Sequence, residues 1–119
     1  MPELAPEIVF GAGTTQSPTT FTLSKAGVST LLANAGYTFT PKDVNSADEL
    51  MAAIICCGLV SLTPAAREAD PANRNIEFDY DPTLNFDTTN LGGITYNRHV
   101  VDVRFYKAIP TPKLNPSDY

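Results

Sequence analysis

The chain has few of the residues from which catalytic and ligand sites are usually built. It contains no tryptophan, one histidine and two cysteines, and only 18% of its 119 residues are charged, against a usual share of about a quarter. Its 13 acidic and 8 basic side chains give a net charge of −5, without a basic stripe. We therefore expect no binding to nucleic-acid phosphates or to an anionic membrane surface.

Long apolar runs are absent as well. The longest one covers residues 50–62 and includes one serine, so it is shorter than the roughly 20 residues that cross a membrane as a helix. Residues 1–7 contain neither a basic segment nor a continuous apolar one. On this pattern we predict neither a membrane span nor a secretory signal.

The two cysteines, Cys56 and Cys57, are neighbours in the sequence. On a helix, adjacent side chains point about 100° apart, which disfavours a disulfide between them. Their spacing is not the C-x-x-C of redox and metal sites, and no histidine lies nearby. We predict two buried free thiols, and no metal or cofactor.

The centre of the core is predicted in residues 46–62, the densest apolar stretch. Ser46 and Glu49 have the spacing of a capping box, in which each side chain bonds the backbone N–H of the other residue. The predicted helix covers residues 47–57 and ends at Gly58, followed by a short extended exit. Its wide buried face is predicted from the spacing of Leu50, Met51, Ile54 and Ile55, followed by Cys57 or Gly58.

A second helix is predicted over residues 24–35, with Ser24 as its N-cap and Gly36 as its terminator. Strand-like alternation of apolar and polar residues is found in three further segments: residues 37–40, 76–80 and 94–109. In the last of these the apolar phase slips, and a bulge or turn is expected near residues 97–98.

The predicted fold class is therefore α+β, with two short helices packed on a mainly antiparallel β-sheet. A single domain is expected over residues 21–109, in which residues 83–90 form a polar loop. Residues 1–20 and 110–119 are rich in proline, which disfavours helices and central strands. We expect both to be extended arms, with only residues 7–10 resembling a strand.

A catalytic centre is not indicated. His99 lies within a strand pattern, and Asp102 falls on the opposite side of a regular strand, so no local pair for nucleophilic or acid–base catalysis is formed. Asp79 and Asp81 share a strand face, which leaves a cation site or an acid–base pair open, although their spacing does not match an EF-hand. We predict a non-enzymatic protein.

Tyrosine and arginine recur along the last predicted strand, at Tyr96, Arg98, Arg104 and Tyr106. Both residue types are enriched at protein interfaces, so this tyrosine–arginine face is a candidate for partner binding. Pairing between strands of the same sheet is the other interpretation. A small ligand-binding or regulatory domain is an alternative function. One candidate site for it is the face of Asp79 and Asp81, and the other is the face of Tyr96 and Arg104.

In its short length, its low charge, the Thr/Ser/Pro-rich stretch before Phe21 and the tail from Pro110 to Tyr119, the chain resembles the small accessory structural proteins of tailed bacteriophages. The resemblance implies a non-enzymatic subunit of a larger protein assembly, such as a capsid decoration, tail or connector protein. Its partners would be further copies of the chain or capsid and tail proteins. Its location would be the virion, after synthesis in the host cytoplasm.

The two terminal arms are the expected connectors in such an assembly, because an extended segment can add a strand to an exposed sheet edge of a neighbour. Together with the tyrosine–arginine face, the arms define the residues predicted to bind partners. These residues are Pro2, Leu4, Pro6, Tyr96, Arg98, Arg104, Tyr106, Pro110, Pro112, Leu114, Pro116 and Tyr119.

Overall fold

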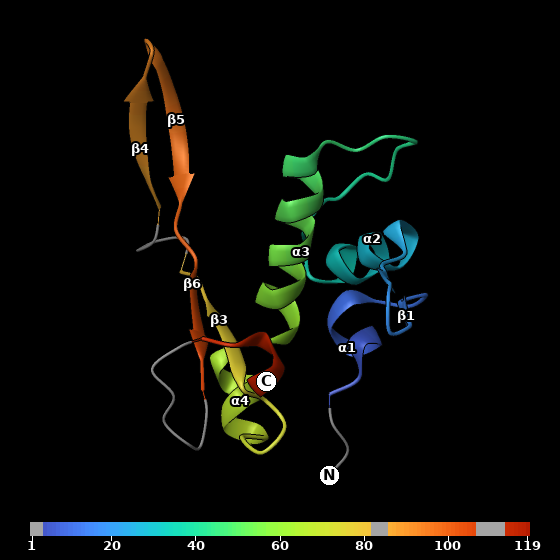
Figure 1. Cartoon of the computed structure of the whole chain (residues 1–119). Helices are drawn as coiled ribbons and strands as arrows, with labels where there is room; N and C mark the ends of the chain where they lie inside the picture. Colours follow the sequence, from blue (N-terminus) through green and yellow to red (C-terminus); the bar gives the residue numbers. More distant parts are fainter. Residues whose placement is uncertain (1–3, 82–85, 107–113) are drawn as a thin grey trace.

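The computed structural model describes residues 4–81, 86–106 and 114–119, and Figure 1 shows their arrangement. The helices are α1 (Pro6–Phe10), α2 (Lys25–Asn34), α3 (Ala47–Ser61) and α4 (Pro64–Ala69), with a short 3-10 helix, η1, at Pro116–Asp118. Helix α3 is central and packs against both α1 and α2. Among the described residues, no helix is both long and apolar enough to cross a bilayer.

All described strands pair antiparallel, but they form three separate two-stranded sheets instead of the single predicted sheet. The pairs are β1 (Thr15–Gln16) with β2 (Phe21–Thr22), β3 (Ile76–Asp79) with β6 (Asp102–Phe105), and β4 (Phe86–Leu91) with β5 (Ile94–His99). Strand β3 contacts α3 and α4, which places the β3–β6 pair beside these helices. The α+β class is confirmed, and so is the strand predicted over residues 76–80.

Both predicted helix starts are confirmed. Ser24 Oγ accepts a hydrogen bond from Gly27 N at 3.1 Å at the start of α2. At the start of α3, Ser46 Oγ accepts from Glu49 N at 3.1 Å, and the Glu49 carboxylate accepts from Ser46 N at 3.2 Å. Gly36 follows α2 with a φ of +87°, a conformation that glycine adopts without steric cost at the end of a helix.

The predicted end of the central helix at Gly58 is wrong, because α3 continues to Ser61. Gly58 is buried, and a Cβ atom at this position would lie 2.6 Å from the ring of Phe78 on β3. The glycine therefore lets a strand approach the helix closely and does not end the helix. The extended exit predicted after it is absent for the same reason.

The predicted buried face of α3 is wrong for Leu50, Met51 and Ile54 but right for Cys57 and Gly58, which are buried. Ala53 and Cys57 are buried in one cluster with side chains of α2, whereas Met51 is 57% exposed and Leu50 and Ile54 are exposed as well. Helices approach each other to a distance set by the side chains at their contact. Here the contact uses the small residues, so Leu50, Met51 and Ile54 are left outside, whereas Ile55 is half-buried.

The N-terminal segment is not an extended arm over its described residues. Pro6 begins α1, where its missing N–H costs no helical hydrogen bond. Val9 is buried, and Ser61 Oγ of α3 donates to Ile8 O at 3.1 Å. The strand-like pattern at residues 7–10 is therefore a helix, because packing against α3 outweighs the local preference for a strand.

The strand predicted over residues 37–40 is absent. This segment belongs to the connection between α2 and α3, and side chains bind its carbonyl groups. Ser29 Oγ donates to Phe39 O at 2.9 Å. Asn45 Nδ2 donates to Thr40 O at 3.1 Å. Side-chain donors thus satisfy the backbone acceptors that a neighbouring strand would otherwise bind.

The long strand predicted over residues 94–109 is divided into β5 and β6, which belong to different sheets. Val100 and Val101 separate them, so the break comes later than the predicted position near residues 97–98. Residues 107–109 lie outside the described part of the chain. The two halves of the predicted strand therefore pair with different strands.

A hairpin replaces the polar loop that was predicted before this strand. Gly92 and Gly93 have φ values of +62° and +81°. Two successive residues with positive φ make the turn whose twist matches a two-residue hairpin. The turn therefore pairs β4 with β5 and converts much of the predicted loop into a strand.

In the C-terminal segment, Tyr119 packs on its own chain. The ring of Tyr119 meets the ring of Phe105 on β6 edge to face, with the ring centroids 5.3 Å apart. Leu114 is exposed. The predicted C-terminal arm is therefore not confirmed.

The chain is less compact than its length suggests. Its Cα radius of gyration is 16.1 Å, whereas a compact domain of this length has about 13.5 Å. Its accessible surface is 8400 Å², against about 6,300 Å² for a compact monomer of the same mass. Among the described residues, five apolar side chains are buried and fourteen large ones are exposed.

Candidate functional site

The β4–β5 hairpin projects away from the β3–β6 pair, as the orange segment of Figure 1 shows. Its strands pair from Phe86 opposite His99 to Leu91 opposite Ile94. Every described side chain in residues 87–100 is exposed, so nothing in the described chain covers the hairpin. A two-stranded hairpin on its own is only marginally stable in water.

The two faces of the hairpin differ in chemistry. Because side chains alternate along a strand, the register places Leu91, Ile94 and Tyr96 on one face. Their exposed fractions are 74%, 57% and 46%. The opposite face carries the polar residues Thr88, Asn90, Thr95 and Asn97. We call the side chains of Leu91, Ile94 and Tyr96 the apolar hairpin face.

An ion pair lies on the same face, toward the base of the hairpin. Arg98 Nε and Nη2 donate to the two carboxylate oxygens of Asp87 at 2.7 and 2.5 Å. This bonding lowers the pKa of the Asp87 carboxyl. Besides this pair, the ionisable side chains of β4 and β5 are those of Tyr96 and His99. The charges of Asp87 and Arg98 therefore cancel on this face of the hairpin.

A second apolar surface is the pocket between α2 and α3, with a volume of about 250 Å³. Six apolar residues line it: Leu23, Val28, Phe39, Leu50, Ala53 and Ile54. The one charged lining residue is Lys25, whose Nζ donates to Lys42 O at 2.9 Å. Leu50 and Ile54 are the exposed α3 residues described above, so the pocket opens onto apolar surface. We call it the α2–α3 pocket.

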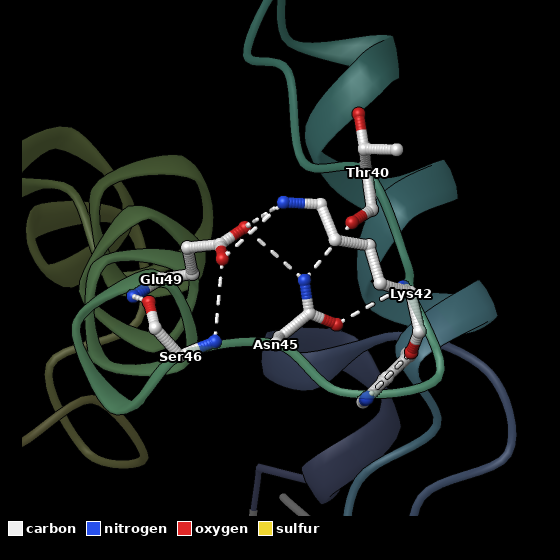
Figure 2. Close-up of polar contacts among 6 residues, drawn as sticks. Thr40, Lys42, Asn45, Ser46 and Glu49 are labelled. Carbon is white, nitrogen blue, oxygen red and sulfur yellow. Dashed lines mark hydrogen bonds and ion pairs between the residues drawn. The ribbon is translucent and has the colours of Figure 1, made fainter.

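Figure 2 shows the polar contacts that hold the connection between α2 and α3. Asn45 is buried, and its Oδ1 accepts from Lys42 N at 3.1 Å. Its Nδ2 donates to Thr40 O at 3.1 Å and to the Glu49 carboxylate at 3.2 Å. The buried amide thus has partners on both of its polar atoms, as burial requires. These bonds fix the segment that carries Phe39 into the pocket wall.

Glu49 is the anion of this network. Its carboxylate accepts from Ser46 N at 3.2 Å and from Asn45 Nδ2, and it lies 3.3 Å from Lys42 Nζ. The backbone N–H of Ser46 is the largest cause that lowers the pKa of Glu49, followed by Asn45 and Lys42. The ionised side chain therefore supports both the start of α3 and the connection before it.

We expect the stability difference between Glu49 and a glutamine at this position to depend on pH. Because folding lowers the pKa of Glu49, the ionised carboxylate contributes fully above its unfolded-state pKa of about 4.3. That contribution is lost as the pH falls through the lower folded-state pKa. Denaturant unfolding of the wild type and of Glu49→Gln should show the two stabilities converging in acid. A difference that stays constant from neutral to strongly acidic pH would contradict this role.

A different polar cluster joins β3 to β6. Glu77 is buried and lies directly opposite Arg104 in the register. Arg104 Nη1 lies 3.2 Å from Glu77 Oε1 and 3.2 Å from Asp79 Oδ2, and Arg104 Nη2 lies 3.6 Å from Asp102. Tyr106 Oη donates to Glu77 at 2.6 Å, a bond that raises the pKa of Tyr106. The cluster binds two strands of the same chain together.

The structure divides the predicted tyrosine–arginine face. Tyr96 and Arg98 lie on β5, whereas Arg104 lies on β6 and Tyr106 follows it. The guanidinium of Arg67 covers the Tyr106 ring, 3.5 Å from its centroid. Both strand arginines pair with carboxylates across their own sheets, which is the other interpretation of the sequence pattern. A ligand site shared by Tyr96 and Arg104 is therefore not supported, and Tyr96 belongs to the apolar hairpin face.

The predicted acidic face does not gather the ligands of a cation. Asp79 is paired with Arg104, and Asp81 has an interaction of its own. Among the described residues, no group of three or more His, Cys, Asp or Glu side chains could hold a metal ion. His99 ends β5 on the surface, and its Nδ1 is hydrogen bonded to Tyr80 Oη. His99 is thus a strand and surface residue, as predicted.

The two cysteines are free, and one is less buried than predicted. Cys57 is fully buried, whereas Cys56 is only partly buried. Burial raises the pKa of both thiols. The protonated thiol is the unreactive form, so a packing role is favoured for both residues over a redox role.

The terminal residues that were predicted to bind partners have different surroundings. Leu4, Pro6 and Tyr119 line one pocket of about 530 Å³. Pro116 begins η1, and Leu114 is exposed. Three further residues of that prediction lie outside the described part of the chain: Pro2, Pro110 and Pro112.

Sequence reasoning missed both apolar surfaces. The pair Gly92 and Gly93, set between two alternating segments, is a recognised hairpin signal and would have revealed β4 and β5. The α2–α3 pocket has no comparable signal, because it forms where two helices and their connection meet.

Comparison of the chain with protein-family models, curated proteins and solved structures finds no match. The function must therefore be inferred from these surfaces.

Proposed function

We propose that the chain is a non-enzymatic structural subunit of a larger protein assembly and that it joins neighbouring copies through the apolar hairpin face. The observation that carries the proposal is a projecting hairpin whose described side chains are all exposed. Burial of a large apolar side chain contributes about 1.5–3 kcal/mol. Covering Leu91, Ile94 and Tyr96 would therefore stabilise both the hairpin and the contact.

The hairpin replaces the terminal arms as the connector in this proposal. The described parts of both ends pack on their own chain, through α1 and through Tyr119. Within the described part of the chain nothing covers the hairpin in this way, and the charges of its Asp87 and Arg98 cancel. The compositional resemblance to accessory proteins of tailed bacteriophages makes a virion the setting that we propose for the assembly.

The proposal predicts that removing the apolar hairpin face leaves a folded monomer. Purified wild-type chain should form oligomers, with a molar mass by light scattering that is a multiple of 12.8 kDa. The triple variant Leu91→Thr, Ile94→Thr and Tyr96→Thr should remain at the mass of one chain. Threonine keeps a high preference for strands, so the hairpin itself should survive.

The matched control changes the polar face of the same hairpin. Asn90→Thr with Asn97→Thr alters two residues of β4 and β5 without touching the apolar hairpin face, and it should assemble as the wild type does. Circular dichroism should be the same for all three proteins. A wild-type chain that is monomeric up to its highest soluble concentration would contradict the proposed function.

A further inference from the structure

Two of the exposed apolar surfaces in the described part of the chain do not cover each other. One is the apolar hairpin face, and the other is the α2–α3 pocket with the exposed residues Leu50 and Ile54 at its opening. In Figure 1 the hairpin and α2 lie on opposite sides of α3. All described side chains of residues 87–100 are exposed, so the hairpin does not reach the pocket of its own chain.

We propose that the apolar hairpin face of one copy binds in the α2–α3 pocket of a second copy. This inference rests on the proposed function and names the surface that receives the hairpin. Leu91 and Ile94 stand opposite each other beside the turn, so they form the leading apolar end of the hairpin. The pocket is lined by apolar residues apart from Lys25, which suits such a pair.

The dimensions of the two surfaces agree. Strands β4 and β5 have six residues each, which corresponds to about 20 Å of strand. Helix α3 has 15 residues, which corresponds to about 22 Å of helix. A hairpin lying along α3 therefore matches its length, with its apolar end placed at the pocket.

Charge favours the hairpin as the part that meets another copy. Each chain carries a net charge of −5, so most approaches of two copies bring like charges together. The hairpin avoids this repulsion, because Asp87 and Arg98 neutralise each other. Lys25, the charged residue of the pocket, is bound to Lys42 O at the pocket wall. The proposed contact thus brings no like charges close together.

Because the hairpin and the pocket are different surfaces, each contact between two copies is heterologous. Such contacts make a ring if the rotation between copies closes, and an open filament if it does not.

The test uses a pocket variant and a neighbouring control on the same helix. Leu50→Gln with Ile54→Gln changes two lining residues, whereas Met51→Gln changes an exposed residue that does not line the pocket. Glutamine is a good helix former, so α3 should persist in both. We expect the pocket variant to be monomeric in light scattering and the Met51→Gln control to assemble as the wild type does.

Mixing two monomeric variants should restore a complex. The hairpin triple variant retains an intact pocket, and the pocket variant retains an intact hairpin, so together they form one complete contact. The mixture should show twice the mass of one chain. A mixture that stays monomeric would overturn the inference. A pocket variant that assembles as the wild type does would also overturn it while leaving the proposed function intact, whereas a monomeric wild type contradicts both.

A second measurement does not depend on how the pocket variant folds. A photoreactive amino acid placed at Leu91 in an otherwise wild-type chain should cross-link to a second copy. Mass spectrometry should place the cross-links in peptides that contain Val28, Leu50 or Ile54. Cross-links confined to the hairpin of the second copy would overturn the inference, because they indicate pairing between hairpins.

Discussion

Replacing Gly27 with alanine should lower the free energy of unfolding by about 3 kcal/mol. Gly27 lies in the first turn of α2, and a Cβ atom at this position would be 1.9 Å from Ala12 O and 2.9 Å from Ala12 C. Both are backbone atoms, so no side-chain rotation can relieve the overlap. The segment around Ala12 would have to move away from α2, which would disturb the packing of α1.

The tertiary contact and the local helix propensity predict opposite signs for the change in stability of Gly27→Ala. In an isolated helix, alanine is more favourable than glycine by about 1 kcal/mol, so the sequence alone predicts that Gly27→Ala stabilises the protein. Thr30→Ala, an exposed change on the same helix, is the matched control and should be neutral or slightly stabilising. Chemical denaturation of both variants decides the point. A Gly27→Ala protein as stable as the wild type would contradict the contact.

Replacing Gly58 with alanine should cost about 2 kcal/mol, and the cost should depend on Phe78. A Cβ atom at Gly58 would meet three atoms of the Phe78 ring at 2.6 to 2.7 Å. The ring would have to turn away from α3, which would loosen the contact between β3 and the central helix. Urea denaturation of Gly58→Ala should therefore show a lower midpoint.

A double-mutant cycle tests whether Phe78 is the cause. In the background of Phe78→Val, the space above Gly58 is larger, and Gly58→Ala should be neutral or stabilising because alanine favours the helix. Residues in contact show coupling energies of about 0.5–3 kcal/mol in such cycles. The same cost in both backgrounds would show that the strain lies elsewhere.

The helix starts could be predicted because their signals are local. The capping box of Ser46 and Glu49 depends on groups that lie within one helical turn, and the N-cap at Ser24 depends on Gly27 in the same way. The alternation that predicted β3 is equally local. The fold class was therefore accessible from the sequence, as were most boundaries of α2.

The candidate site was harder to predict from the sequence than the fold class. The turn at Gly92 and Gly93 is a local signal that the sequence interpretation overlooked, so the hairpin was predictable in principle. The exposure of Leu50 and Ile54 was not, because the apolar spacing of α3 is the same whichever of its faces is buried. The packing of α1, α2 and β3 against α3 decides which face of this helix is buried.

Short-range chemistry therefore specified helix α2, the caps at Ser24 and Ser46, and the hairpin turn of this protein. Contacts between distant segments decided the rest. The Phe78 ring leaves no room for a Cβ atom at Gly58, and the Ala12 backbone leaves none at Gly27. Packing at the small residues Ala53 and Cys57 left Leu50, Met51 and Ile54 of α3 exposed. The physical reason is that burial depends on which elements approach each other, and that choice is made over the whole chain.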